Sequence, residues 1–452
     1  MRIIPNLKLT LSEVAYATGA ALSNTDIPIG AIVTNSKEVQ KNDLFVALRG
    51  ESANGEDFTD IAKCNGAFIL SARNNKADIK VMDTEAALLR IAALYKSKLN
   101  KLKHTVAITG SVGKTTTKNI LNEVLKTAYN VHSTHGNYNN YLGVSHTILT
   151  APSDCEILVI EMGMNHRGEI SELSKAVSPD ISVITNIGTA HIGNLGSRES
   201  IANAKLEITD GMKSPLIIVP ADEVLLKNSK GRYTFSLSKR ASDCFVDNIR
   251  EDAFGTLFDV CTKTQFAKDV RINIPGRHVL SAVAIAASVL ENTKLELRLL
   301  AESLPKIKSD SVVRAKLIKR GCYEIYDDTY SASYEATVAN FEMLSKKHKK
   351  MSCILGDMLE LGEKSEDIHV RLGETIVKYG FQRLFTFGRA ATYIARGAQN
   401  AGMKKDCIFI NEDIDAPNIT AEQIKRNCER DELLFFKASH AVHAERIYDF
   451  LN

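Results

Sequence analysis

A glycine-rich turn near residue 110 contains the residue types that bind nucleotide phosphates. Gly110 and Gly113 are followed at once by Lys114 and Thr115, in the spacing G-x-x-G-K-T. Glycines let backbone N–H groups approach phosphate oxygens, a lysine can reach the outer phosphates, and a threonine hydroxyl can ligate Mg²⁺. A plain glycine turn beside a solvated lysine is the alternative. We predict an ATP site formed by Gly110, Ser111, Val112, Gly113, Lys114, Thr115 and Thr116.

The segments on either side of this turn predict a strand and a helix. A β-branched run from Thr105 to Thr109 precedes the first glycine, and apolar residues at 120, 121, 124 and 125 follow with helical spacing. A helix that begins at the turn directs its free N–H groups and the positive end of its dipole toward the turn. This context favours phosphate binding over a plain turn.

Polar residues follow two further predicted strands and could complete such a site. Glu161 ends one buried apolar run, Asn186 and His191 follow another, and a helix over 197–211 then presents Lys205. Because ligands bind at the carboxyl ends of parallel strands, Glu161 is a candidate Mg²⁺ ligand. The structural alternatives are a hydrogen-bonding loop residue for His191 and a surface position for Lys205. The three side chains converge only if their strands are neighbours.

Two other segments concentrate polar side chains that could contact a substrate. The segment HGNYNNYLG contains Asn137, Asn139 and Asn140. Amides and glycines this close together usually form turns, and they can also position a ligand, so the spacing leaves both interpretations open. A later strand runs into Asp327 and Asp328, which could bind an amine or a ribose or cap the next helix. We favour binding, because two adjacent acids at a strand end are costly unless they are used.

Composition and charge exclude several classes of partner. The chain has 452 residues, 44% of them hydrophobic and 25% charged, which leaves room for about three globular domains. A net charge of +3, with both signs mixed, argues against nucleic acid. We expect no signal peptide and no membrane span, because no apolar run is long enough. The eight cysteines contain no C-x-x-C pair and are expected to be reduced, so we predict a cytoplasmic protein.

Strands alternate with helices along the whole chain, which predicts an α/β protein of three domains. We place a small α/β N-terminal domain at residues 1–100. A central P-loop domain, with a doubly wound and mostly parallel sheet, occupies 101–308. A Rossmann-like C-terminal domain occupies 309–452. Within the central domain the less periodic stretch 228–272 predicts antiparallel strands.

Five blocks of sequence, in order along the chain, match the pattern of one enzyme family. They are TGSVGKTTTKN, EMGMNHRGEI, ITNIGTAHIGNLGSRESIANAKLEI, DDTYSAS and LGDMLELGEKSEDIH. Together they resemble the Mur ligase family. The resemblance implies that ATP phosphorylates a substrate carboxylate to an acyl phosphate, which an amine attacks to form an amide in peptidoglycan precursor synthesis. It implies a UDP-linked muramoyl tripeptide, bound by the N-terminal domain, and D-alanyl-D-alanine, bound by the C-terminal domain. We expect a monomer.

The resemblance also implies roles for individual catalytic residues. Lys114 would hold the outer phosphates and Thr115 a first Mg²⁺. Glu161 and His191 match a second Mg²⁺ site, so two ions are expected. Lys205 matches a lysine that family members carbamylate with CO₂, which turns its side chain into an anion.

Further residues match nucleotide and substrate positions of the family. His278, Arg314 and Asp328 are implied to contact ATP, the last two from the C-terminal domain. The implied substrate-binding residues are Ser36, Asn137, Asn139, Asn140, Asn186, Asp327 and Tyr330.

Several family positions carry different residues in this chain. Asp-Ser-Arg becomes Asn-Ser-Lys at 35–37, both amides of His-Asn-x-x-Asn are lost after His278, and Tyr-Asn-Ala-Asn becomes Tyr-Ser-Ala-Ser at 330–333. Lys-Gly-Ser-Arg becomes Lys-Ala-Ser-His at 437–440. Two alternatives therefore stay open: a divergent ligase that joins a different carboxylate and amine, and a non-catalytic nucleotide-binding protein. The retained second metal site argues against the non-catalytic protein.

Overall fold

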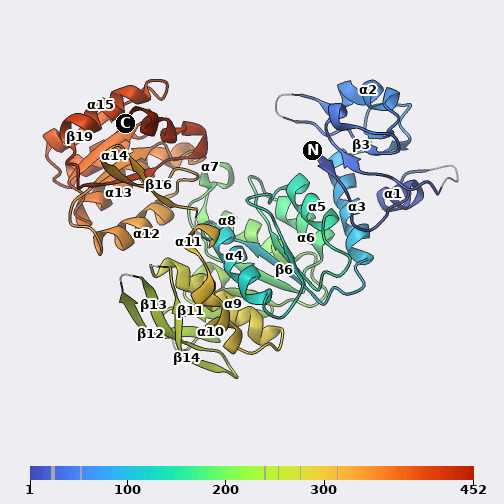
Figure 1. Ribbon diagram of the computed structural model, residues 1–452, viewed down its shortest axis with the longest axis horizontal. Helices are drawn as coiled ribbons and strands as arrows, with labels where there is room; N and C mark the ends of the chain where they lie inside the picture. The colour runs from blue at the N-terminus through green and yellow to red at the C-terminus, as the bar shows by residue number, and fades with distance from the viewer. Residues whose placement is uncertain are drawn as a thin grey trace.

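The strands of the protein form three separate sheets that follow one another along the chain. The computed structural model describes residues 1–21, 26–50, 53–238, 241–252, 254–274, 276–312 and 314–451. Within these ranges the sheets contain five, nine and six strands. Figure 1 shows three lobes, with the N-terminal lobe in blue and the C-terminal lobe in orange and red on opposite sides of the central one. The predicted three-domain α/β architecture is confirmed, while the boundaries near residues 100 and 308 stay predictions.

The first sheet has the order β1-β2-β3-β4-β5, in which only the β1–β2 pair is antiparallel. Its strands are β1 (Arg2–Ile3), β2 (Ile32–Val33), β3 (Leu44–Val46), β4 (Phe68–Ser71) and β5 (Ile79–Lys80), and the helices are α1 (Leu11–Thr18), α2 (Thr59–Cys64) and α3 (Thr84–Ser97). The helix α3 also contacts the central lobe, because the Tyr95 hydroxyl donates to the Ala151 carbonyl at 2.7 Å.

The central sheet has the order β14-β13-β12-β11-β10-β9-β6-β8-β7. Its strands are β6 (His104–Thr109), β7 (Val131–Ser133), β8 (Ile157–Glu161), β9 (Ile181–Ile184), β10 (Ile217–Pro220), β11 (Arg232–Ser236), β12 (Cys244–Asp252), β13 (Gly255–Cys261) and β14 (Phe266–Ile272). The helices of this region are α4 (Lys114–Leu125), α5 (Tyr141–Leu149), α6 (Glu169–Val177), α7 (Ile192–Leu195), α8 (Arg198–Leu206), α9 (His278–Asn292), α10 (Arg298–Ser303) and α11 (Ser309–Val312).

The strand order brings the predicted site residues to one edge of the central sheet. The strand β6 pairs in parallel with β8 on one side and β9 on the other. Nearly every residue of these three strands is buried, as expected for parallel strands covered by helices on both faces. The loops after β8 and β9 therefore flank the glycine turn that follows β6, which is the neighbour relation that the site requires.

The stretch 228–272 differs in part from the prediction of antiparallel strands. The β12–β13 and β13–β14 pairs are antiparallel as predicted, but β11 pairs in parallel with both β10 and β12. Within β11 the polar residues Thr234 and Ser236 are buried, and the Thr234 hydroxyl donates to the Asp243 carboxylate at 2.9 Å. This satisfied polar side chain allows β11 to extend the parallel part of the sheet.

The third sheet has the order β15-β16-β20-β17-β18-β19, in which only β15 pairs antiparallel. Its strands are β15 (Lys316–Arg320), β16 (Tyr323–Asp328), β17 (Met351–Gly356), β18 (Arg383–Phe387), β19 (Ile408–Asn411) and β20 (Leu433–Lys437), and the helices are α12 (Tyr334–Ser345), α13 (Ser365–Lys378), α14 (Thr392–Asn400) and α15 (Pro417–Asn427). Alternating parallel strands and helices agree with the Rossmann-like prediction.

All eight cysteines are free in the structure. No helix within the described residues has both the length and the apolar content needed to cross a membrane.

Candidate active site

The glycine turn has the geometry of a phosphate-binding loop. Gly110 has φ 152°, and a Cβ placed on it would lie 1.9 Å from the Thr185 hydroxyl oxygen, so only glycine fits between β6 and β9. Gly113 has φ 82° and precedes α4 without supplying a side-chain cap. Because Gly113 has no side chain to cap the helix, the first N–H groups of α4 remain available to donate hydrogen bonds to an anion.

Asn186 holds the middle of this loop in place. Its side-chain oxygen accepts from the Val112 N–H at 2.9 Å, and its amide donates to the Val112 carbonyl at 2.9 Å. The Thr185 hydroxyl donates to the same carbonyl at 2.6 Å. Asn186 therefore positions the phosphate loop in this structure, and its role toward a substrate stays a prediction.

Thr115, Glu161 and Asn139 form one connected cluster beside the loop. The Thr115 hydroxyl donates to Glu161 Oε2 at 2.9 Å, and the Asn139 amide donates to Glu161 Oε1 at 2.9 Å. Lys114 Nζ donates to the Gly110 carbonyl at 2.7 Å. Burial lowers the pKa of Lys114, while the nearby Glu161 carboxylate acts in the opposite direction. The structure thus brings together four residues that the sequence analysis proposed from three different segments.

Arg314 reaches this cluster from the chain segment that leads into the third sheet. Its guanidinium donates to the Thr115 hydroxyl at 2.6 Å and lies 4.1 Å from the centre of the Tyr330 ring. Tyr330 in turn stacks on the His440 ring at 5.5 Å. This stack links the third sheet directly to the phosphate loop.

Lys205 lies inside the protein, so its interpretation as a surface lysine is wrong. Its side chain is only 2% exposed. Burial, reinforced by the positive charge of Lys114, holds the pKa of Lys205 well below its ordinary value. The shift favours the neutral amine over the ammonium ion, and the amine is the form that reacts as a nucleophile.

His191 makes its contact with the third sheet rather than with Glu161. Its Nδ1 atom lies 2.5 Å from the Glu360 carboxylate, in the loop that follows β17. In the described ranges no three or more His, Cys, Asp or Glu side chains are grouped so that they alone could hold a metal ion. A Mg²⁺ ion here would need phosphate oxygens to complete its coordination, as is usual in nucleotide sites. The hydroxyl of Thr115 and the carboxylate of Glu161 are the hard oxygen donors that Mg²⁺ prefers, so these residues fit the ion.

A cavity of about 490 Å³ lies between the phosphate-loop lobe and the third sheet. Central-lobe residues line one side and third-sheet acids the other, so an amine or a nucleotide would contact both lobes. Its lining comprises Asn119, Gly136, Asn137, Asp310, Val312, Arg314, Lys316, Asp327, Asp328, Thr329, Tyr330, His440 and Glu445.

Both predicted acids of the third sheet have partners within the protein. Asp328 forms an ion pair with Lys437 at 2.5 Å and accepts from the Asn340 amide at 2.7 Å. Asp327 accepts from the N–H and the hydroxyl of Thr329. The adjacent carboxylates therefore have separate structural partners and also line the cavity.

Loss of the amine in the Asp328–Lys437 pair is expected to destabilise the C-terminal lobe. Lys437 is buried, so Lys437→Met leaves the Asp328 charge without its cation and should lower the free energy of unfolding by about 3 kcal/mol. Lys350→Met removes an exposed pair with Glu429 in the same lobe and should cost less than about 1 kcal/mol. Urea unfolding followed by circular dichroism measures both; equal losses would contradict the prediction.

Two predicted residues, Asn140 and Ser36, lie away from the Thr115 cluster. The side chain of a third, His278, is not described. Asn140 caps α5 by accepting from the Gly143 N–H at 3.0 Å, which is the turn chemistry left open above. Ser36 is buried at the start of a 3₁₀ turn (Ser36–Glu38) in the first lobe. His278 begins α9, but its side chain lies outside the described part of the structure.

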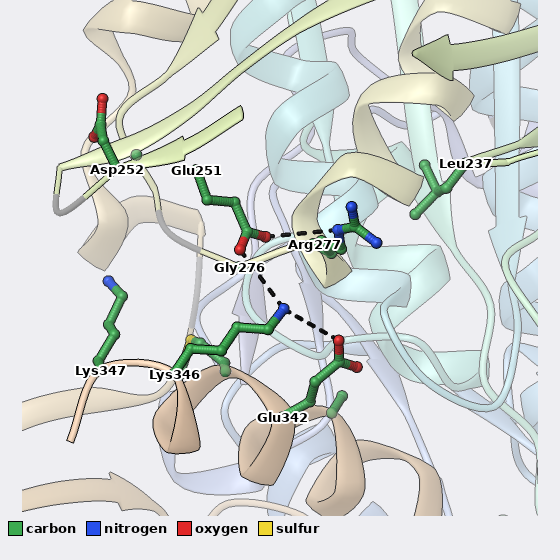
Figure 2. Close-up of a pocket in the computed structure, with 11 residues that line it drawn as sticks. Leu237, Glu251, Asp252, Gly276, Arg277, Glu342, Lys346 and Lys347 are labelled. Atoms are coloured by element: carbon green, nitrogen blue, oxygen red, sulfur yellow. Dashed lines mark hydrogen bonds and ion pairs between the residues drawn. The ribbon is translucent and has the colours of Figure 1, made fainter. Parts of the chain in front are cut away.

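A second cavity, of about 190 Å³, lies where the central sheet meets α12. Figure 2 shows the Glu251 carboxylate of β12 between the Arg277 and Lys346 side chains. The ion-pair distances are 3.8 Å to Arg277 and 3.6 Å to Lys346. Because Arg277 directly precedes His278, the predicted nucleotide-contacting start of α9 lies at this contact between lobes.

Sequence reasoning missed Lys118 and the pairing of Glu360 with His191. Lys118 is buried and donates to the carbonyls of Thr134 and Gly136 at 2.6 and 2.9 Å. The signal for it was present, because Lys118 shares the apolar face of α4 with Leu121 and Leu125 at i+3 and i+7. Its bonds hold the start of the amide-rich loop beside Glu161.

The fold and the site define a three-lobed α/β nucleotide-binding protein whose phosphate loop is covered by its C-terminal lobe. Residues 108–290 match the model of the Mur ligase middle domain. The chain is 35% identical to the UDP-N-acetylmuramoyl-tripeptide–D-alanyl-D-alanine ligase of Bacillus subtilis (strain 168), over 98% of each chain. It is 31% identical to the ligase of the same name from Escherichia coli (strain K12), over 86% of this chain and 88% of that one.

Solved structures agree with these sequence relatives. A crystal structure of MurF from Acinetobacter baumannii superposes with a TM-score of 0.88 at 26% identity, covering 99% of both chains. MurF ligase from Thermotoga maritima in complex with ADP superposes with a TM-score of 0.78 at 30% identity, covering 93% of this chain and 96% of that one. The chain therefore belongs to the Mur ligase family.

Proposed function

We propose that this protein is an ATP-dependent ligase that joins D-alanyl-D-alanine to UDP-N-acetylmuramoyl-tripeptide. The main support is the 2.6 Å hydrogen bond from Arg314 to the Thr115 hydroxyl, which brings the segment leading into the third sheet to the phosphate loop. Identity of 35% over 98% of both chains to the Bacillus subtilis ligase supports the same substrate pair. The acidic cavity between the lobes suits the ammonium group of a dipeptide.

The reaction has two covalent steps. A carboxylate oxygen of the tripeptide attacks the γ-phosphorus of ATP, the bond to the bridging oxygen breaks, and ADP leaves. The dipeptide amine then attacks the carbonyl carbon of the acyl phosphate, inorganic phosphate leaves with the carboxylate oxygen, and the amine loses a proton. Both steps concentrate negative charge, so cations must lie where that charge develops.

The residues of this chain supply most of that stabilisation. Lys114, which donates to the Gly110 carbonyl, and Arg314, which donates to the Thr115 hydroxyl, would neutralise the phosphates together with the N-terminus of α4. We propose two Mg²⁺ ions, the first held by Thr115 and the second by Glu161 and His191, which would screen the phosphate charge. Arg314 and Asp328 would contact ATP from the C-terminal domain, and Asn137, Asn139 and Tyr330 would face the substrates.

We propose that Lys205 is carbamylated. Its neutral amine would add to CO₂, forming an N–C bond and releasing one proton, and the resulting anion would compensate the positive charge of Lys114 nearby. The buried position supports this, because burial and the nearby charge of Lys114 both disfavour the ammonium form of Lys205.

The site is assembled from a single chain, so we propose a monomer. Use of ATP and eight free cysteines support a cytoplasmic location. We also propose that residues 1–100 bind the UDP-linked substrate, 101–308 bind ATP, and 309–452 bind the amine and close on the nucleotide.

Phosphate release tests the proposed reaction. With Mg²⁺ and ATP, phosphate is expected only when the UDP-linked tripeptide and D-alanyl-D-alanine are both present. Release with other dipeptides or amines but not with this pair would favour the divergent ligase, which the changed residues at 330–333 and 437–440 would explain. No release with any acceptor would favour a non-catalytic nucleotide-binding protein.

A further inference from the structure

Two carboxylates of the C-terminal lobe hold the loop that follows β9. Glu360 pairs with His191, and its backbone carbonyl accepts from the Gly193 N–H at 3.0 Å. Glu335, in the first turn of α12, accepts from the N–H and the hydroxyl of Thr189 at 2.9 and 3.1 Å. The loop is thus fixed from one side by residues of another lobe.

Two glycines, Gly193 and Gly362, allow the loop that follows β9 and the loop that follows β17 to contact each other through their backbones. A Cβ on Gly193 would lie 2.5 Å from the Gly362 nitrogen, and a Cβ on Gly362 would lie 2.8 Å from the Gly193 Cα. Two backbones therefore touch directly beside the Glu360–His191 pair. Any change in how the C-terminal lobe sits would move Glu360 relative to the imidazole.

The same loop is attached to the phosphate loop at its other end. The Gly188 N–H donates to the Ser111 hydroxyl at 2.9 Å, and Asn186 holds Val112. Residues 186–193 therefore join the phosphate loop to the C-terminal lobe in one continuous set of contacts.

The environment of the imidazole distinguishes its two nitrogens. Nδ1 is completely buried and lies against Glu360, whereas the His191 side chain as a whole keeps 23% of its surface exposed. Since a carboxylate occupies Nδ1, the other nitrogen is the one left for a ligand. Metal-binding histidines commonly use this arrangement, in which a carboxylate on one nitrogen fixes the ring and raises the basicity of the other.

We propose that Glu360 is a positioning residue that orients His191 for a divalent cation, so that the metal site of the central lobe is complete only when the C-terminal lobe is seated. The inference rests on the proposed function, which assigns His191 to the second Mg²⁺. Glu360 touches neither substrate nor metal in this account. It makes metal affinity depend on the position of the lobe that carries Arg314.

Glu335 provides the matched control, because it holds the same loop from the same lobe without contacting His191. The probe is Mn²⁺, titrated in the presence of ADP and followed by the loss of the free-ion electron paramagnetic resonance signal. Glu360→Ala is expected to weaken the His191-dependent Mn²⁺ site by about 10- to 100-fold. Glu360→Gln, which keeps an oxygen beside Nδ1, should recover part of the loss, and Glu335→Ala should leave the affinity within about twofold.

A double variant tests whether Glu360 affects Mn²⁺ binding by orienting His191 or only by holding the two lobes together. In a His191→Ala background, Glu360→Ala should cause no further loss of Mn²⁺ affinity. Wild-type affinity in Glu360→Ala, an equal loss in Glu335→Ala, or additive losses in the double variant would overturn the inference. So would the absence of any His191-dependent Mn²⁺ site in the wild-type protein.

The binding experiment requires no turnover, so its failure is distinct from failure of the proposed reaction. If the protein ligates its substrates but Glu360→Ala binds Mn²⁺ as tightly as the wild type, only this inference is contradicted. A chain that shows the Glu360 effect but ligates no dipeptide contradicts only the proposed reaction.

Discussion

Lys205→Ala is expected to lower the ligation rate by about 10²- to 10³-fold. This is the size of effect seen when an enzyme loses a group that stabilises charge in the transition state. The variant loses the amine that would carry the carbamate, and with it the anion proposed beside Lys114. A small carboxylic acid such as acetate should enter the vacated space and restore part of the rate. The measurement is phosphate release with saturating substrates, with and without added acid.

An exposed lysine of the same lobe provides the control for this variant. Lys175 lies in the last turn of α6 and is exposed, so Lys175→Ala should keep the wild-type rate. A wild-type ligation rate in Lys205→Ala would contradict the proposed carbamate. Rescue of Lys205→Ala by chloride as well as by acetate would indicate a general salt effect and also count against it.

Glu161→Gln is the second variant with a large expected effect. The amide keeps the size of the side chain and can still accept from Thr115, but it lacks the negative charge proposed to hold Mg²⁺. We expect the ligation rate to fall by about 10²- to 10³-fold, with a higher Mg²⁺ concentration needed for half-maximal rate. The assay is phosphate release over a Mg²⁺ titration.

Glu123→Gln tests whether the loss of any carboxylate on this lobe has the same effect. Glu123 lies on α4 and pairs with Lys126 at 3.2 Å on the surface, so its contribution is small. Wild-type Mg²⁺ dependence is expected for it. If Glu161→Gln also kept wild-type dependence, Glu161 would be a structural partner of Thr115 and Asn139 only.

Local patterns were sufficient to predict the phosphate loop. The β-branched run before Gly110 and the helical spacing after Lys114 each specify an element by itself, and the glycines fix the turn between them. Glu161 could also be selected as a candidate, because it ends a buried strand and parallel sheets bind ligands at the carboxyl ends of their strands. These inferences needed no knowledge of which strands pair.

The contacts between segments could not be predicted in the same way. The Asn139–Glu161 and Asn186–Val112 bonds exist because β6 lies between β8 and β9, and strand order depends on packing across the whole lobe. The Glu360–His191 pair depends on how the C-terminal lobe packs against the central lobe. The hydrophobic periodicity of a segment predicts its secondary structure but not the packing of one lobe on another. The parallel pairing of β11 was missed for a related reason, since alternation reports which faces are apolar but not the direction of the partner strand.

The proposed reaction requires a substrate carboxylate to be phosphorylated in the site between the phosphate loop and the C-terminal lobe. The most direct measurement uses UDP-linked tripeptide with ¹⁸O in the carboxylate that becomes the amide. We predict that each inorganic phosphate released during ligation with D-alanyl-D-alanine carries one ¹⁸O atom. Phosphate without the label would show that ATP is hydrolysed by water, and would contradict the account.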